Sequence, residues 1–201
     1  YLAFKNGSDK LFRRKFRVTR STFNFILHTL QAAGHCLDNR RRNGIKRVKG
    51  EYKLAVVLYF LAHGGEFESV GDIVGIAPLT LQKYVAAISD AINVVIGPDW
   101  INVKPGVAMA RKHQRFFALR RGISHIGGAA DGTHIPVRVD DEEMKEEYHN
   151  YKGWYSHLCV ALVSPMYTFI GFEGGWPGRA GDSTCTAESW WYRAVMEDAD
   201  E

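Results

Sequence analysis

Two aspartates stand in sequence contexts that suit metal-dependent chemistry. Asp131 interrupts a run of small and apolar residues, IGGAADGTHIPVRV at 126–139, and Asp182 ends a glycine-rich stretch 51 positions further on. Strands are poor in Asp, and a buried unpaired carboxylate is costly, so such a carboxylate needs a partner or a role. Carboxylate oxygens are the ligands that Mg²⁺ prefers. An acid at a strand end and a second acid from a loop can converge in a folded sheet domain.

Three other interpretations of these residues remain open at this point. Asp131-Gly132 is a common hairpin dipeptide between strand-like flanks, so a simple turn is the first alternative. Asp131, His134, His149 and His157 could ligate zinc, although they lack a standard ligand spacing. The glycine-rich stretch also invites a phosphate-loop interpretation, but the pattern GxxxxGK[ST] is missing. Its glycines are better explained by a sharp turn that presents Asp182.

Length and composition describe a globular chain. The 201 residues suit one large or two small domains, and the hydrophobic content of 46% allows a buried core. No apolar run reaches the length of a membrane span, and the N-terminus does not read as a secretory signal, so we expect an intracellular protein. Cys36, Cys159 and Cys185 form no CxxC pair, which predicts reduced thiols. Because the chain lacks an initiator Met, we expect a fragment.

Charge divides the chain into two parts. Residues 1–122 hold 21 Lys/Arg and 8 Asp/Glu, whereas residues 123–201 hold 5 Lys/Arg and 14 Asp/Glu. A basic front and an acidic back suggest different tasks for the two parts. The front is suited to bind a polyanion, and the back is suited to bind cations, although solvated surface explains much of any charge excess.

The front part has the pattern of a helical region. Apolar spacing predicts a helix from Thr19 or Ser21 to about Gly34, and a helix-turn-helix-like segment at about 53–95. Within that segment the candidate recognition helix presents Gln82 and Lys83, a thin surface for reading DNA, and a structural helix bundle is equally consistent. A basic loop between these helices could contact phosphates or be solvated surface. Its cations are Arg40, Arg41, Arg42, Lys46, Arg47 and Lys49.

The pattern changes to strands after Gly122, where we place the domain boundary. Short strand-like runs surround Asp131, and SHLCVALVSP at 156–165 is typical of a buried strand. MYTFIGFEGG follows after a predicted hairpin turn at Ser164-Pro165, and TAESWWYRAV at 186–195 is predicted to be helical. The acidic run at 140–147 is expected to be solvated, and the tryptophans are expected mainly to pack in the core.

Three motifs resemble the catalytic domain of PIF/Harbinger-type transposase-derived nucleases, members of the DDE superfamily. They are GAADGTHIPV at 128–137, YHNYKGWYSHLCVALV at 148–163 and GGWPGRAGDS at 174–183, in the order and spacing of that family. FRVTRSTFNFIL is similar to the segment that opens the family's helical region. The resemblance implies an α + α/β fold class. A helix-turn-helix-like region at 1–122 would precede a partial RNase-H-like α/β domain at 123–201.

The resemblance also implies a function. Asp131 and Asp182 would be the first two members of a catalytic acid triad that binds Mg²⁺ or Mn²⁺ and cleaves DNA by a two-metal mechanism. A separate Myb-like DNA-binding partner and a nuclear location are implied as well.

The chain departs from the family pattern at two points. Gly181 stands where the family usually has His, and no acid after Asp182 lies in a recognisable third-acid context. Glu188, six positions after Asp182, is not expected to be the third acid. We therefore expect a domain that is incomplete at its C-terminus. The alternative function is a catalytically inactive DNA- or partner-binding protein derived from a transposase.

Overall fold

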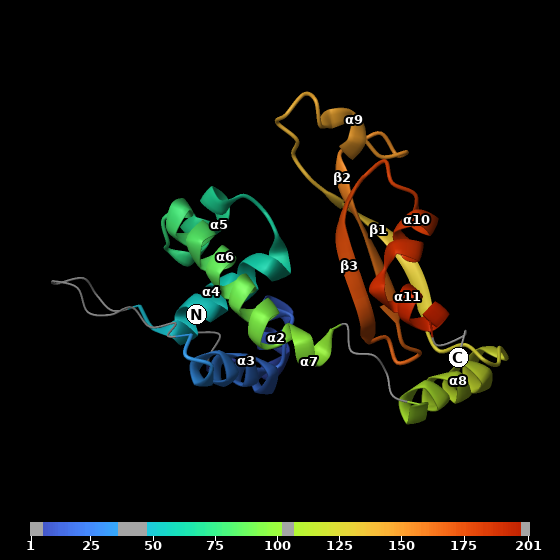
Figure 1. Ribbon diagram of the computed structural model, residues 1–201. Helices are drawn as coiled ribbons and strands as arrows, with labels where there is room; N and C mark the ends of the chain where they lie inside the picture. Colours follow the sequence, from blue (N-terminus) through green and yellow to red (C-terminus); the bar gives the residue numbers. More distant parts are fainter. Residues whose placement is uncertain (1–5, 36–47, 102–106, 198–201) are drawn as a thin grey trace. The chain divides into compact units, whose positions relative to one another are not determined.

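The chain forms two compact units. The computed structural model describes residues 6–35, 48–101 and 107–197 (Figure 1). One unit spans Tyr1–Pro98 and the other spans Asp99–Glu201, so the division falls upstream of the predicted boundary near Gly122. Helix α8, which ends at Arg121, belongs to the second unit because buried His113 on it hydrogen-bonds the carbonyl oxygen of Gly127 at 3.1 Å.

The first unit is helical throughout its described residues. Its core is formed by aromatic and aliphatic side chains from four helices, among them Phe12, Phe23, Leu30, Leu54 and Ile88. In α4, residues 54–58 are all buried, so this helix is covered by its neighbours on every side. The helices are α2 (Asp9–Phe16), α3 (Arg20–Ala32), α4 (Gly50–His63), α5 (Phe67–Val74), α6 (Pro78–Val95) and α7 (Gly97–Trp100).

Helix starts follow the local signals in the sequence. The Thr19 side chain caps α3 by accepting a hydrogen bond from the Thr22 amide at 3.1 Å, and Pro78 occupies the first turn of α6. The predicted helix from Thr19 or Ser21 to about Gly34 is thereby confirmed, and Gln82 and Lys83 lie on a helix as predicted. Between α5 and α6 lie only Gly75, Ile76 and Ala77, which gives a short helix, a three-residue turn and a longer helix.

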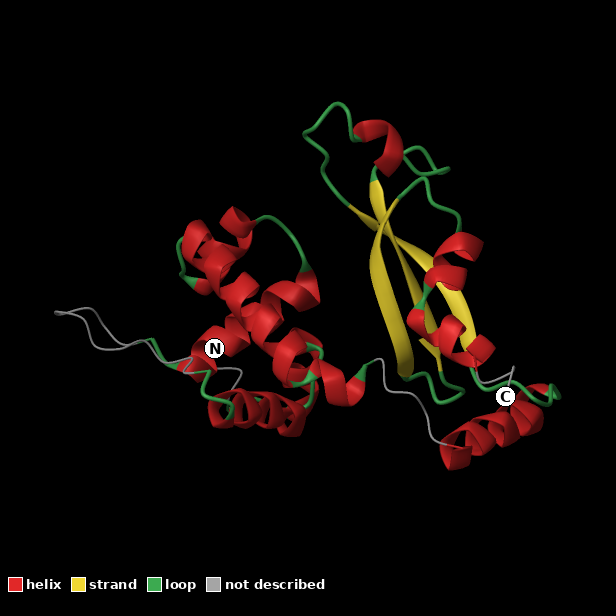
Figure 2. Cartoon of the chain, in the orientation of Figure 1, coloured by secondary structure: helices red, strands yellow, loops and turns green. Residues whose placement is uncertain are grey.

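The second unit combines a small antiparallel sheet with helices (Figure 2). The strand order is β1-β2-β3, so β2 is central and β1 lies at an edge of the described sheet. The strands are β1 (Ala129–Pro136), β2 (Ser156–Val163) and β3 (Phe169–Pro177). The helices are α8 (Val107–Arg121), α9 (Lys145–Tyr148), α10 (Asp182–Glu188) and α11 (Trp190–Glu197). A helical region followed by an α+β unit is therefore the observed architecture.

Helices α10 and α11 cover one face of this sheet. Leu158 and Val160 of β2 form a buried cluster with Cys185 of α10 and Trp191 of α11. Trp191 fits closely because Gly171 of β3 has no side chain, and a Cβ there would lie 2.7 Å from the indole Cδ1. Core positions for tryptophans, as predicted, are confirmed at Trp191 and at partly buried Trp176 and Trp190.

Three further sequence expectations have clear outcomes. The turn after Ser164 is confirmed, because the Ser164 amide donates to the Thr168 carbonyl oxygen at 2.8 Å. The helical segment at 186–195 is interrupted at Ser189, so it forms the end of α10 and then α11. Cys159 and Cys185 are free thiols, as expected, whereas Cys36 lies outside the described residues. Among the described helices, none has the length and hydropathy needed to cross a bilayer.

Candidate active site

Asp131 lies within a continuous strand. Strand β1 pairs with β2 at every position from Ala129 to Pro136, and Asp131 stands opposite Ala161. The Asp131 carboxylate is exposed, and its Oδ1 accepts a hydrogen bond from the amide of Gly132 at 3.0 Å. The hairpin-turn alternative for Asp131-Gly132 is therefore wrong, because both residues take part in strand pairing.

Asp182 begins the helix that packs on the sheet. After β3 ends at Pro177, four residues lead to Asp182 in the first turn of α10, where the partial positive charge of the helix N-terminus favours a carboxylate. Buried Cys185 of α10 packs against Leu158 and Val160 of β2, and α10 also contacts β1. The local fold therefore fixes the position of Asp182 relative to the strands.

Gly132 lies between the two aspartates. A Cβ on Gly132 would lie 2.6 Å from Cγ and 3.0 Å from Oδ2 of Asp182, so the Asp182 carboxylate lies directly against this residue. Neighbouring side chains of a strand point to opposite faces, so Asp131 projects away from the face that Asp182 covers. The two carboxylates flank Gly132 from the two sides of β1, at a strand that is an edge within the described sheet.

The other acids near this position have structural partners. Glu188 accepts a hydrogen bond from the Trp176 indole at 2.9 Å, and Glu173 accepts one from the Trp190 amide at 3.1 Å. Within residues 6–35, 48–101 and 107–197, no three His, Cys, Asp or Glu side chains are grouped so that they could hold a metal ion. This excludes a zinc site of Asp131 with His134, His149 and His157, all of which are described.

A buried hydrogen-bond network fixes the segment next to β1. Ser156 Oγ lies 2.9 Å from His134 Nδ1 and accepts a hydrogen bond of 2.9 Å from the Asn150 amide group. Asn150 Oδ1 accepts hydrogen bonds from the amides of Lys152 and Trp154. Because Ser156 accepts from Asn150, its hydroxyl can donate to His134 Nδ1 and leave the proton on Nε2. Sequence reasoning missed Asn150 and Ser156, although both lie in the motif at 148–163.

This network holds aromatic side chains near the strand. The His134 ring lies edge-on to Tyr151 at 5.6 Å and to Trp154 at 5.9 Å between ring centroids. Tyr151 is 82% exposed, so its ring is available to a ligand, and the backbone of Asn150 and Lys152 on either side of it is held by hydrogen bonds. A stacking surface for bases or sugars is a chemical use that such an exposed ring allows.

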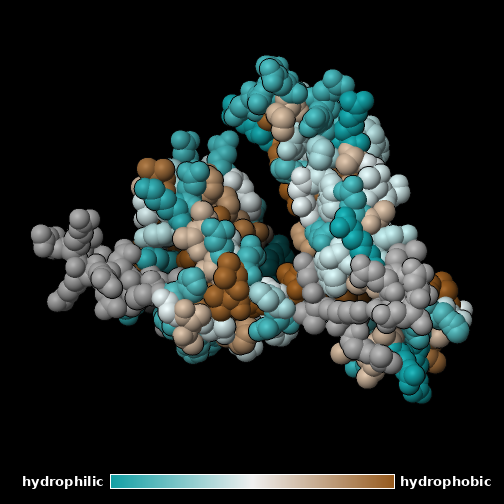
Figure 3. All heavy atoms as spheres, in the orientation of Figure 1, coloured by the Kyte–Doolittle hydropathy of each residue, from teal (hydrophilic) through white to brown (hydrophobic). Residues whose placement is uncertain are grey.

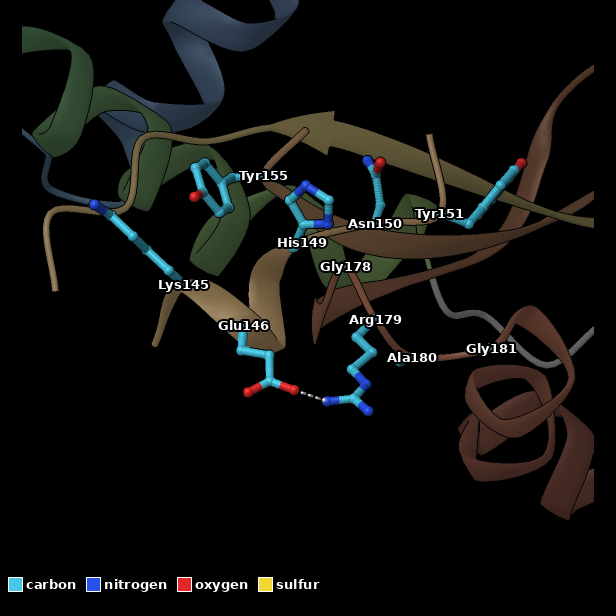
Figure 4. Close-up of a pocket in the computed structure, with 10 residues that line it drawn as sticks. All are labelled: Lys145, Glu146, His149, Asn150, Tyr151, Tyr155, Gly178, Arg179, Ala180 and Gly181. Carbon is cyan, nitrogen blue, oxygen red and sulfur yellow. Dashed lines mark hydrogen bonds and ion pairs between the residues drawn. The ribbon is translucent and has the colours of Figure 1, made fainter. Parts of the chain in front are cut away.

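An open pocket of about 790 Å³ adjoins the segment that leads to Asp182 (Figure 4). Arg179 pairs with Glu146 across it at 2.8 Å, and Figure 4 shows Lys145 and Tyr155 on the opposite side. The hydrogen bond to Glu142 raises the pKa of Lys145 above its ordinary value. In the view of Figure 3, hydrophilic side chains cover the end of the unit that carries α9.

The predicted DNA contacts fall into two groups. Arg40, Arg41, Arg42, Lys46 and Arg47 lie outside the described residues. Lys49 at the start of α4, and Gln82 and Lys83 on α6, are exposed on the helical unit. These three side chains are accessible to a ligand.

Comparison with known proteins agrees with the sequence resemblance. Residues 130–201 match the family model described as DDE superfamily endonuclease. The chain is 23% identical over 165 residues to "Putative nuclease HARBI1" of Rattus norvegicus and of Homo sapiens, covering 82% of this chain and 46% of each relative. It is 23% identical over 194 residues to "Protein ALP1-like" of Arabidopsis thaliana, covering 92% of this chain and 45% of the relative. The chain thus spans about half the length of these curated relatives.

No solved structure matches this chain. The family match begins at Ala130, one residue before Asp131, and includes Asp182 with the whole network around Asn150. Residues 130–201 of this chain therefore match a DDE superfamily endonuclease domain, the superfamily that its three motifs predicted.

Proposed function

We propose that this chain cleaves DNA phosphodiester bonds, as an endonuclease or transposase, with Asp131 and Asp182 as its metal-binding catalytic residues. The observation that carries the proposal is the position of the Asp182 carboxylate against Gly132, the residue that follows Asp131. Two acids separated by 51 positions in sequence thus lie on either side of Gly132, inside the region that matches the endonuclease superfamily.

The donor set fits a hard divalent cation. Asp131 and Asp182 both present exposed carboxylates, and oxygen ligands with water in the remaining positions suit Mg²⁺ and Mn²⁺. When bound, two such ions would activate the nucleophile and stabilise the leaving oxygen. The residues of this chain have the task of holding the carboxylates in place, Asp131 by strand pairing and Asp182 by the packing of α10.

The same proposal includes the finer features of the two units. The sheet unit would be part of an RNase-H-like catalytic domain, and α5 with α6 would be a DNA-binding helix-turn-helix. Exposed Lys49, Gln82 and Lys83 support this assignment, because polar and cationic side chains contact phosphates and base edges. A DNA substrate favours a nuclear location and a Myb-like DNA-binding partner, which imaging and co-purification of the tagged chain would test.

One observation favours a second candidate function. No third carboxylate joins Asp131 and Asp182 among the residues that the structure describes, and Glu188 is held by Trp176. A site with two acids binds metal weakly, so the chain would then be an inactive DNA- or partner-binding protein that keeps the fold of a nuclease. This alternative predicts that Asp131→Asn changes only the surface charge.

A plasmid-nicking assay separates the two candidates. The chain is incubated with supercoiled DNA in Mg²⁺, Mn²⁺ or EDTA, beside Asp131→Asn, Asp182→Asn and Asp140→Asn. Asp140 is a matched control, because it is an exposed acid that pairs with Arg138 on the surface. Nicking that needs the metal and is lost in the first two variants alone supports the proposed nuclease. Nicking that is absent, or equal in all variants, favours the binding protein.

A further inference from the structure

One face of helix α2 carries an unusual concentration of positive charge. Lys10, Arg13, Arg14 and Arg17 are all exposed, and we call these four residues the α2 cationic face. They line an open hollow of about 880 Å³ together with Thr19, Arg20, Ser21 and Asp9. The hollow therefore has five cationic side chains and one carboxylate in its wall.

Helix geometry gathers these cations on one side. Positions 10, 13, 14 and 17 follow the spacing i, i+3, i+4 and i+7, which places residues on the same helix face. Phe12 and Phe16 are buried against Phe23 on the other side and fix the orientation of the helix. The cationic face is thus held toward solvent by the packing of the core.

The acid in this hollow is already neutralised. Asp9 Oδ1 lies 2.7 Å from Arg20 Nε, and Arg20 also donates to the Gly7 carbonyl oxygen and stacks over the Phe12 ring. Within the described part of the chain, no carboxylate pairs with the four residues of the α2 cationic face. Like charges at these spacings repel one another, so the arrangement destabilises the free protein and calls for an anionic ligand.

Arg17 adds a second, independent observation. It caps α2 in the left-handed conformation, with φ of 58°, and its amide donates to the Arg13 carbonyl oxygen. Glycine is the residue that suits such a cap, and a side chain in this conformation is strained. Strained residues that persist without a structural benefit are concentrated at functional sites. At Arg17 a cationic side chain therefore stands at the edge of the hollow on a backbone that suits glycine.

We propose that the α2 cationic face binds the phosphate backbone of duplex DNA. Guanidinium and ammonium groups supply multiple donors to phosphate oxygens, and the hydroxyls of Thr19 and Ser21 at the rim can donate as well. None of the residues that line the hollow is aromatic, so it offers no ring on which a base could stack. The ligand is the backbone and not the bases, and binding is independent of sequence.

This inference rests on the proposed function for the choice of DNA as the polyanion. It does not depend on cleavage, because the α2 cationic face and the two aspartates belong to different units. DNA binding in EDTA can thus be measured with the active-site carboxylates left unchanged. The two proposals fail separately.

Salt-dependent binding tests the inference. Fluorescence anisotropy with a labelled 20-base-pair duplex of arbitrary sequence is measured from 50 to 300 mM NaCl in EDTA, with the full chain. Each phosphate contact contributes about 0.9 to the slope of log K against log salt, which is about an eightfold change in affinity at 0.1 M salt. The variant Arg13→Gln/Arg14→Gln should lower the slope by about 1.8 and the affinity by up to about sixtyfold.

Two further variants sharpen the test. Lys15→Gln removes one positive charge next to Arg14, half the charge change of the double variant. Lys15 lies over the Tyr59 ring at 5.9 Å and away from the hollow, so the slope should stay near that of the parent chain. Arg17→Gly removes a cation and relieves the left-handed strain. It should therefore weaken DNA binding about eightfold while the melting temperature stays the same or rises.

Three results would overturn the inference. The first is a slope that is equal in Arg13→Gln/Arg14→Gln and the parent chain, and the second is an equal loss in Lys15→Gln. The third is binding to phosphatidylserine vesicles without binding to the duplex at 0.1 M salt. If nicking is lost in Asp131→Asn while the salt slope of Arg13→Gln/Arg14→Gln equals that of the parent chain, this inference fails and the nuclease proposal stands. If the substitutions in the α2 cationic face lower the slope but the chain does not nick DNA, this inference stands and the nuclease proposal fails.

Discussion

Replacing Gly132 by Ala tests whether the position of Asp182 matters. The new Cβ would lie 2.6 Å from Asp182 Cγ, whereas an ordinary contact begins near 3.4 Å, so the carboxylate must retreat by about 0.8 Å. Misplacement of about 1 Å at a reacting group costs up to about a hundredfold in rate, and displaced metal ligands cost about 10- to 100-fold in affinity. We expect Gly132→Ala to lose Mn²⁺ affinity and nicking activity by these factors.

The fold should tolerate this substitution. The Asp182 side chain is exposed, so it can rotate into solvent, and Gly132 has no left-handed backbone angle that would exclude Ala. Ala also reduces the entropy of the unfolded chain relative to Gly, which offsets part of any strain. The free energy of unfolding should therefore change by less than about 1 kcal/mol.

Isothermal titration with Mn²⁺ and urea unfolding measure the two effects on the same samples. Gly127→Ala is the matched control, because it makes the same chemical change five positions upstream, where a Cβ would meet nothing within 4 Å. The control should bind Mn²⁺ as the parent chain does. If Gly132→Ala binds Mn²⁺ and nicks DNA as well as the control, the contact between Gly132 and Asp182 has no role in the site and our reasoning is wrong.

Three other variants or measurements follow from the structure. Asn150→Ala removes a fully buried amide that serves Ser156 and two backbone amides, so urea unfolding should show a loss of about 2–4 kcal/mol, and a loss below about 0.5 kcal/mol would contradict the network. Trp191→Ala opens the core over Gly171 and should cost about 3–5 kcal/mol, unlike exposed Tyr192→Ala, which should cost little. Burial raises the pKa of the Cys159 and Cys185 thiols, so the thiolate fraction at pH 8 is smaller in the folded chain than in the unfolded chain. Iodoacetamide should therefore label both thiols slowly until urea unfolds the chain, and peptide mass spectrometry measures the labelling. Because the unfolded thiols ionise first, these groups should also lower the free energy of unfolding as the pH rises above about 9.

Local signals account for the parts of the fold that could be predicted. Pro78 and the apolar spacing after it define the start of α6, and Thr19 caps α3, because both signals act within one or two helical turns. The dipeptide Asp131-Gly132 is also a local signal, but it favours a turn, which the structure does not form there. Pairing of β1 with β2 from Ala129 to Pro136 outweighs that preference, and such pairing depends on residues about 30 positions away.

The sequence proposes site residues by type, and it does not predict their geometry. The motifs identified Asp131 and Asp182, but the contact of Asp182 with Gly132 requires the packing of α10, which depends on Cys185 and the hydrophobic face of β2. Asn150 and Ser156 belong to the motif at 148–163, but their hydrogen bond forms only when the loop after α9 folds back onto β2. Spacing along a chain contains no information on such approaches.

The α2 cationic face is also only partly predictable from the sequence. Its spacing of cations at positions 10, 13, 14 and 17 is visible in the sequence, but so is Asp9, which could have neutralised part of it. Only the folded chain pairs Asp9 with Arg20, eleven positions on, and only the backbone of Arg17 shows that an arginine occupies a conformation that favours glycine. The four like charges repel one another, the nearby carboxylate of Asp9 is paired with Arg20, and the backbone of Arg17 is strained. Neither the repulsion nor the strain stabilises the free protein, so together they are evidence for an anionic ligand.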